Sequence, residues 1–253
     1  MAGRKPGRTG AASPERIDDA RHAGLKARQR ALRDGFPEGL GLRVHRALSW
    51  LDRAEREVDD QDTRFILLWI GFNSAYASDI GEDYVTEQSR FRTFFRTLAD
   101  LDADGDIHGV LWSRFSNEVR TLLVNPYVFP AFWKHHNGQP DYADWREQLE
   151  AQRREIFASL AAKDTGKVLG LVFERLYVLR NQLVHGGATW NGRVNRAQVR
   201  DGAALLGRLL PAFIDILMSH PDRNWGQPFY PVVEEAGAGP VKASGRGAKP
   251  PRW

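Results

Sequence analysis

Apolar side chains recur at steps of three and four residues through most of the chain between residues 42 and 219. That spacing is the period of an α-helix that buries one face. The clearest run is Val44, Ala47, Leu48, Leu51 and Ala54. Signals for strands are sparse, and the best of them is the short stretch 230–233. The pattern therefore predicts an all-α fold, a helical bundle of roughly six to seven helices.

The spacing also predicts where the individual helices lie. They are expected in 42–58, 84–101, 107–124, 141–163, 165–185 and about 195–219, with a further helix from Asp62 to about Tyr76. A charged, weakly amphipathic helix is expected within 15–33. Asp62 is the expected N-cap of its helix, and Asp141 or Asp144 is the expected N-cap of the helix in 141–163.

The positive charge of the chain sits at its two ends. The net charge is +4 and the isoelectric point is about 9.5. Residues 1–33 hold nine Lys and Arg against three Asp and Glu, and 242–253 hold four against none, which leaves 34–241 at −6. We therefore expect a basic, partly disordered extension over 1–35, one helical domain over 36–233, and a flexible basic tail over 234–253.

Composition excludes several classes of protein. Hydrophobic residues make up 42% of the chain, enough for a sizeable core, and the aromatic residues in 65–76 and 91–95 are expected to lie in it. The absence of cysteine excludes disulfide scaffolds, thiol nucleophiles, zinc fingers and iron–sulfur sites. No apolar segment typical of a signal peptide stands near the N-terminus, and the longest apolar run, 65–70, is too short to cross a bilayer. A soluble, cytoplasmic protein with no membrane partner is expected.

The sequence contains no complete motif for binding a metal ion or a cofactor. Residues 100–106 resemble the first half of a calcium-binding loop, but its ninth position is His108 and its twelfth is Leu111, where a bidentate Glu is required. His135 and His136 are adjacent and point apart on any regular element. No glycine-rich phosphate loop, dinucleotide fingerprint or nucleophile elbow is present in the sequence. No metal and no cofactor are therefore expected.

The segment 180–187, RNQLVHGG, is the strongest candidate site. It closes the helix in 165–185, which is apolar nearly all round and therefore expected to be buried, although an unpaired buried charge is costly. Asn181 and His185 are four residues apart and lie nearly on one face, whereas Arg180 and His185 are about 140° apart around the axis. A long Arg side chain still reaches the region of His185, either within one chain or across a subunit interface. Gly186 suits the residue that ends the helix.

The segment RNQLVHG resembles the signature of the HEPN superfamily, which is Arg, a polar residue (often Asn), three to five further residues and then His. Residues 62–76, DTRFILLWIGFNSAY, with Arg46, Trp50 and Ala54 before them, resemble a helix of its Apea-like branch, so the resemblance covers about 42–220. It implies a helical bundle that forms a homodimer with two motifs facing each other in a cleft. Many members are metal-independent endoribonucleases of toxin–antitoxin, abortive-infection or other anti-phage systems.

Carried onto this chain, the resemblance implies that Arg180 and His185 are the catalytic pair and that Asn181 is a supporting polar residue. RNA is the implied substrate, and an antitoxin or other defence partner is expected. Toxins silenced by modification of a tyrosine carry it two residues after the motif His, but this chain has Gly187 there, so control by that route is not expected.

The chemistry of such a site agrees with these residue types. RNA carries its own nucleophile, the 2′-OH, whose attack on the adjacent phosphorus leaves a 2′,3′-cyclic phosphate. His185 supplies a group that exchanges protons near neutral pH, and Arg180 supplies a fixed cation for the phosphoryl oxygens. RNA contacts are expected from the motif, from Arg193, Arg196 and Arg200, or from the basic ends.

Two other functions fit the same residues. One is a non-catalytic HEPN module that binds RNA, a nucleotide or a partner protein. The other is an unrelated helical interaction protein, in which Arg180 pairs with Glu174 and His185 merely caps the helix.

Overall fold

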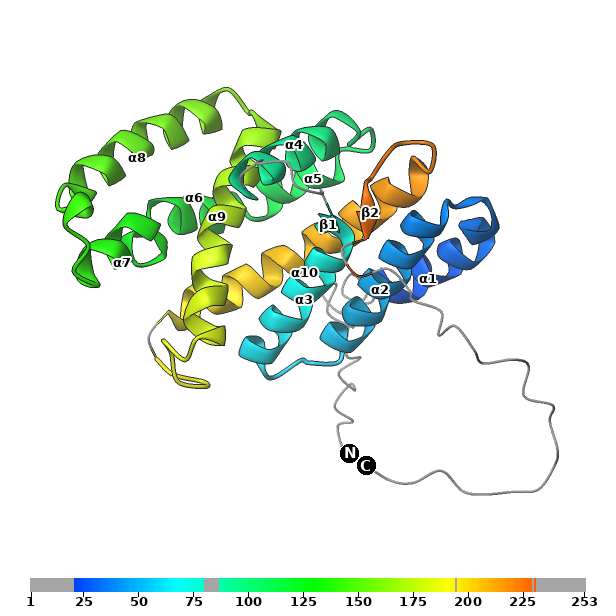
Figure 1. Ribbon diagram of the computed structural model, residues 1–253, viewed down its shortest axis with the longest axis horizontal. Helices are drawn as coiled ribbons and strands as arrows, with labels where there is room; N and C mark the ends of the chain where they lie inside the picture. Colours follow the sequence, from blue (N-terminus) through cyan, green and yellow to red (C-terminus); the bar gives the residue numbers. More distant parts are fainter. Residues whose placement is uncertain (1–20, 80–86, 194, 229, 231–253) are drawn as a thin grey trace, which may run out of the picture.

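The computed structural model describes residues 21–79, 87–193, 195–228 and 230, and most of them lie in helices (Figure 1). The α-helices are α1 (Arg21–Leu32), α2 (Glu38–Glu55), α3 (Gln61–Tyr76), α4 (Glu87–Asp100), α5 (Asp106–Gly109), α6 (Ser116–Val124), α7 (Pro130–His136), α8 (Trp145–Ala161), α9 (Thr165–Val184) and α10 (Arg196–Ser219). Two-residue strands β1 (Ser78–Asp79) and β2 (Gln227–Pro228) pair antiparallel. The all-α prediction is confirmed.

The described residues contain ten α-helices, more than the six to seven expected. One reason is that the predicted helix 107–124 is interrupted by a π-turn at Val110–Arg114, where the Phe115 N–H donates to the Val110 carbonyl at 3.0 Å. A second is that α7 is too short to show a clear period; it begins at Pro130, the proline that the sequence marks as a break.

Helices α2, α3 and α10 pack side by side, and α1 covers α2 and α10 (Figure 1). Helix α9 crosses this group and joins it to α4, α6 and α8. A small separate core, made of Phe129, Ala131, Trp145 and Leu149, holds α7 against the first half of α8. The molecule therefore has a main core and a satellite core on the α7–α8 side.

An aromatic cluster fills the main core, as the sequence predicts. The Phe72 ring is fully buried and lies 4.4 Å from the Phe173 ring, and the Phe95 ring lies 4.5 Å from Phe173, centroid to centroid. Close approach of the helices depends on Gly71, where an added Cβ would stand 2.7 Å from Leu210 Cδ2. Dense packing of this kind fixes where α9, and therefore its C-terminal end, sits.

Helix ends follow the predictions in part. Asp62 is not the N-cap of α3, because Asp60 holds that position and accepts from the Thr63 N–H at 3.0 Å. Asp144 stands at the N-cap position of α8 but makes no capping bond from its side chain, and Asp141 lies in the preceding 3₁₀ turn. In the predicted strand 230–233, Tyr230 lies in a bend and the rest falls outside the described residues.

Arg43, in the second turn of α2, is a buried cation that the sequence did not single out. It is 1% exposed, and its guanidinium donates to four carbonyls, those of Ala75, Ala77, Gly226 and Gln227, at 2.7–3.2 Å. Burial lowers the pKa of Arg43 to about 10, so the group stays charged at neutral pH. Arg43 thereby ties the end of α3 and the segment before β2 to α2.

The folded part begins earlier than the boundary predicted at residue 36. Helix α1 packs on α2 and α10 through Leu25 and Gln29, so 21–35 belongs to the domain rather than to the extension. Most of the basic ends, 1–20 and 231–253, falls outside the described residues. Helix α10 is long and apolar enough to cross a membrane, but 78% of its most apolar window is buried inside the protein.

Candidate active site at the end of α9

The candidate site lies where a buried helix reaches the surface. Val172, Phe173 and Leu179 of α9 are fully buried, whereas Val184 in its last turn is 50% exposed and His185 is exposed. Gly186 follows with φ of 71°, the left-handed conformation that glycine adopts easily, so the predicted end of the helix is confirmed. The sequence thus places Arg180, Asn181 and His185 where α9 leaves the core.

Arg180 and Asn181 contact each other. Arg180 Nη1 donates to Asn181 Oδ1 at 2.9 Å, and its guanidinium carbon lies 6.0 Å from the centre of the Tyr177 ring. Glu174 does not pair with Arg180, because it binds Arg175 Nη1 at 3.0 Å. The expectation of an Arg180–Glu174 pair is therefore wrong, and Arg180 has no carboxylate partner in the part of the chain described.

His185 is not part of the hydrogen bond between the other two side chains. It occupies the C-cap of α9, where its backbone N–H donates to the Asn181 carbonyl at 3.0 Å. Among the described residues its imidazole has no hydrogen bond to Arg180 or Asn181. Within one chain, the structure therefore joins Arg180 to Asn181 but leaves His185 open to solvent.

Exposed apolar side chains surround this end of α9. Of the eight large hydrophobic side chains that are exposed in the described residues, four are found here: Tyr127, Trp133, Val184 and Trp190. The Tyr127 carbonyl accepts from Gln182 Nε2 at 2.9 Å and from Trp133 Nε1 at 2.7 Å, which holds the turn before α7 beside the motif. Sequence reasoning missed Tyr127 and Trp133, because this contact spans more than fifty residues.

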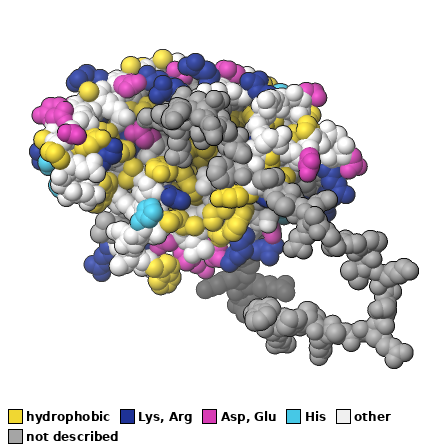
Figure 2. Space-filling view, viewed as in Figure 1, with side chains coloured by type: hydrophobic (Ala, Val, Ile, Leu, Met, Phe, Trp, Pro, Cys, Tyr) yellow, Lys and Arg dark blue, Asp and Glu magenta, His cyan; other side chains and the backbone are white. Residues whose placement is uncertain are grey.

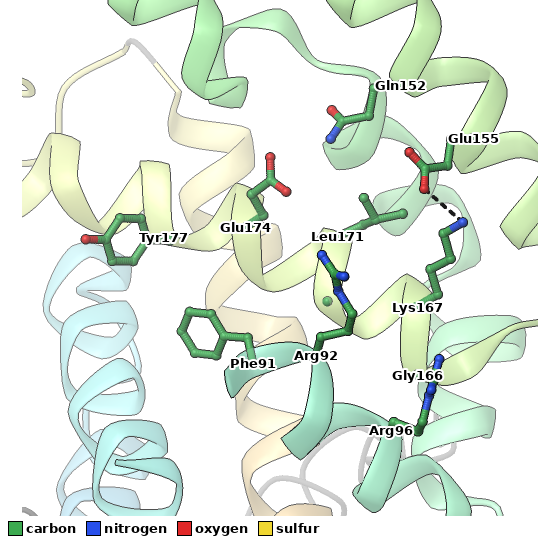
Figure 3. Close-up of a pocket in the computed structure, with 11 residues that line it drawn as sticks. Phe91, Arg92, Arg96, Gln152, Glu155, Gly166, Lys167, Leu171, Glu174 and Tyr177 are labelled. Carbon is green, nitrogen blue, oxygen red and sulfur yellow. Dashed lines mark ion pairs between the residues drawn. The ribbon is translucent and has the colours of Figure 1, made fainter. Parts of the chain in front are cut away.

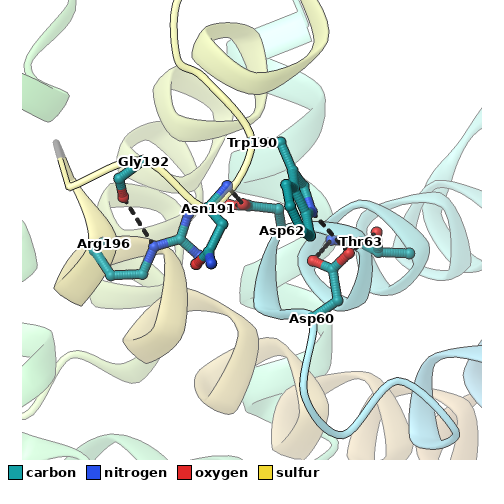
Figure 4. Close-up of polar contacts among 7 residues, drawn as sticks. All are labelled: Asp60, Asp62, Thr63, Trp190, Asn191, Gly192 and Arg196. Atoms are coloured by element: carbon teal, nitrogen blue, oxygen red, sulfur yellow. Dashed lines mark hydrogen bonds and ion pairs between the residues drawn. The ribbon is translucent and has the colours of Figure 1, made fainter.

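The loop after the motif is held by the start of α3 (Figure 4). Asp62 is 7% exposed, and its Oδ2 accepts from the Asn191 N–H and from Arg196 Nη2, each at 2.7 Å. Trp190 Nε1 donates to Asp60 Oδ2 at 2.9 Å. Asp62, expected as a cap, instead fixes a loop that begins directly after His185.

We expect Asp62→Ala to loosen this loop without unfolding the protein. Loss of two hydrogen bonds to a buried carboxylate should lower the free energy of unfolding by about 1–3 kcal/mol. The Asn191 amide should lose most of its protection in hydrogen exchange, because Asp62 is its acceptor. Asp201→Ala, which breaks an exposed pair with Arg200, is the matched control. Unchanged exchange at Asn191 would contradict the assignment.

Two of the three arginines from which the sequence predicts RNA contacts are held in ion pairs. Arg196 is paired with Asp62, and Arg200 is paired with Asp201 at 3.0 Å. Arg193 is exposed and has no ion pair within the described residues. Acidic and basic side chains are interspersed on the face shown in Figure 2, and those of the described residues form no continuous basic strip there.

The two segments that do not fit a metal-binding motif, 100–106 and 135–136, have structural roles. Asp102 caps α5, accepting from the N–H groups of Ile107 and His108 at 3.2 and 2.9 Å, so this segment is a helix–helix turn. His136 packs on Phe132, 4.2 Å between ring centres, at the end of α7. No group of three or more potential metal ligands is found in the described ranges.

Comparison with known proteins identifies no relative. No family model, no curated protein and no solved structure gives a significant match to this chain.

Proposed function

We propose that the protein is a metal-independent endoribonuclease with a HEPN-like helical fold. The observation that carries this proposal is Arg180, a cation without a carboxylate partner that Asn181 orients at the open end of α9, five residues before an exposed His185. A guanidinium held by a neutral amide keeps its charge available to an incoming anion, and a phosphodiester is the anion that matches its planar fork.

The reaction follows from the chemistry of RNA. The 2′-oxygen forms a bond to phosphorus as a base removes its proton, and the bond from phosphorus to the 5′-oxygen breaks as that oxygen takes a proton. His185 serves as the group that accepts or returns a proton. Arg180 stabilises the negative charge that builds on the non-bridging oxygens, and Asn181 positions Arg180.

We further propose that two copies form the site together. In one chain no hydrogen bond joins His185 to Arg180, and the exposed side chains Tyr127, Trp133, Val184 and Trp190 lie near this end of α9. Apolar patches of this kind are typical of interfaces. An isologous dimer through this end would set His185 of each chain near Arg180 of the other.

Cleavage in the absence of metal tests the proposal. The purified protein should cut single-stranded RNA in excess EDTA at an undiminished rate, because neither His185 nor Arg180 needs a metal ion. The products should end in 2′,3′-cyclic phosphate, detected by mass spectrometry, and 2′-O-methyl RNA should resist. Activity that EDTA removes, or cleavage of the 2′-O-methyl strand, would contradict this mechanism.

A toxin or anti-phage role is the proposed biological setting, with an antitoxin or defence protein as partner. Expression of the wild type should slow bacterial growth, whereas His185→Ala should not. The second candidate function is a non-catalytic module that binds RNA, a nucleotide or a partner protein. The lack of a hydrogen bond between His185 and Arg180 within one chain favours it, and binding without cleavage by the wild type would establish it.

A further inference from the structure

A cleft of about 620 Å³ opens between α4, α8 and α9 (Figure 3). Arg96 lies at one end of it and Tyr177 at the other. Gly170 also lines it, on α9. Its volume is in the range of pockets that hold a nucleotide-sized ligand. None of the residues expected from the sequence to form the site lines it.

The charges in the cleft do not cancel. Lys167 Nζ pairs with Glu155 Oε1 at 2.8 Å, and Glu174 is held by Arg175. Arg92 and Arg96, one turn apart on α4, line the cleft and have no acidic partner in the described part of the molecule. Two cations on one wall therefore remain to bind anionic groups, in a domain whose sequence is otherwise net negative.

The floor and the ends of the cleft suit a nucleotide chain. An added Cβ at Gly170 would meet no atom within 4 Å, so the helix leaves open space there. Phe91 and Tyr177 offer half-buried aromatic rings, and Leu171 adds an apolar surface. Cations beside aromatic rings are the combination with which proteins bind single-stranded nucleic acid.

The cleft leads to the candidate active site. Gly170, Glu174, Tyr177 and Asn181 follow one another at steps of four, three and four residues, which puts them on one face of α9. Gly170 and Asn181 are separated by roughly 16 Å along the helix axis. Tyr177 belongs to both regions, because it lines the cleft and its ring lies 6.0 Å from the Arg180 guanidinium.

We infer that this cleft binds the single-stranded RNA next to the cleavage site, with Arg92 and Arg96 contacting its phosphates. The inference takes its ligand class from the proposed function. The cleft supplies positive charge that Arg196 and Arg200 cannot give, since both are already in ion pairs. Arg92 and Arg96 are thus binding residues, distinct from Arg180 at the reacting phosphate.

Binding of a 2′-O-methyl RNA 12-mer, which cannot be cut, tests the inference directly. Arg92→Ala/Arg96→Ala should weaken binding roughly tenfold at moderate salt, measured by fluorescence anisotropy. The slope of log K against log salt should fall by about 1.4, as expected for two lost contacts to a single strand. Arg53→Ala/Arg56→Ala, an equal change of charge at exposed positions at the end of α2, is the control and should leave both values near those of the wild type.

Gly170→Leu tests the cleft without removing charge. Its side chain would project into the open space and should weaken binding of the 12-mer at least as much as the double variant. Gly170→Ala should bind normally and melt roughly 2 °C higher, since alanine favours a helix interior more than glycine does. Circular dichroism of all variants shows whether the fold is kept.

The outcomes separate this inference from the proposed function. A wild type that binds the 12-mer through Arg92 and Arg96 but cuts no RNA supports the cleft and overturns the nuclease. A wild type that cuts RNA, with 12-mer binding unchanged in both cleft variants, overturns the cleft alone. Failure of the wild type to bind the 12-mer also overturns it. Binding of a free nucleoside monophosphate as tightly as the 12-mer would overturn the assignment of an RNA strand.

Discussion

Arg180→Ala and His185→Ala are each expected to lower the single-turnover rate of RNA cleavage by roughly 10²–10⁴-fold. Loss of His185 removes the proton acceptor or donor. Loss of Arg180 removes the cation that stabilises negative charge on the non-bridging oxygens. Asn181→Ala should have a smaller effect, because Arg180 stays in place but loses the contact that orients it. Rates on a doubly labelled RNA in EDTA measure all three.

Two control variants replace an arginine and a histidine elsewhere in the protein. Arg120 and His108 are both exposed and lie on other helices, so Arg120→Ala and His108→Ala should cleave at the wild-type rate. Melting temperatures of Arg180→Ala and His185→Ala should stay close to that of the wild type, because both side chains sit at the open end of α9. Full activity in either variant would remove the catalytic assignment.

Mixing the two inactive variants tests the composite site. In a dimer of Arg180→Ala with His185→Ala, one of two sites regains an intact arginine from one chain and an intact histidine from the other. Random exchange of subunits should therefore restore about a quarter of the wild-type activity. No recovery, with subunit exchange confirmed by native mass spectrometry, would show that each chain acts with its own pair.

Replacement of Arg43 is expected to be the most damaging change to stability. Arg43→Met removes a buried guanidinium and leaves up to four carbonyls without a donor, so the free energy of unfolding should fall by roughly 3–5 kcal/mol. Arg43→Lys should recover part of the loss, because an ammonium cannot reach both sets of carbonyls. Urea unfolding followed by circular dichroism gives these values.

Arg46→Met is the matched control for Arg43. Arg46 lies one turn further along α2, where its guanidinium donates to the exposed Tyr230 carbonyl at 2.7 Å. Its replacement should cost well below 1 kcal/mol, as is usual for surface positions. Equal losses in the two variants would mean that the four carbonyls do not depend on Arg43.

The helical fold and the end of α9 could be predicted from sequence because both depend on near neighbours. The spacing of apolar residues sets the buried face of a helix, and Gly186 stops α9 within a few residues of the motif. The roles of Arg43 and Asp62 could not be predicted, since their partners lie more than thirty and more than one hundred residues away.

Local ambiguity explains the other errors. Glu174 has two arginines within reach along α9, Arg175 beside it and Arg180 a turn and a half further on, and their spacing does not show which of them forms the ion pair. Arg175 forms it, because it is buried and needs a partner. The residues from 107 to 124 keep a helical period, but their hydrogen bonds shift at Val110–Arg114. The cleft forms where α4 meets α8 and α9, which follow much later in the sequence, so no short motif signals it.

The satellite core beneath α7 and α8 has a consequence for motion. Four buried residues stabilise this part, against more than forty in the main cluster, so its opening should need much less energy than unfolding of the whole domain. Helix α8 forms one wall of the cleft and is anchored in the main core at Ile156. The first half of α8 can therefore detach together with α7, while Gln152 and Glu155, which lie beside Ile156, stay in place, so the wall of the cleft survives local opening of its neighbour.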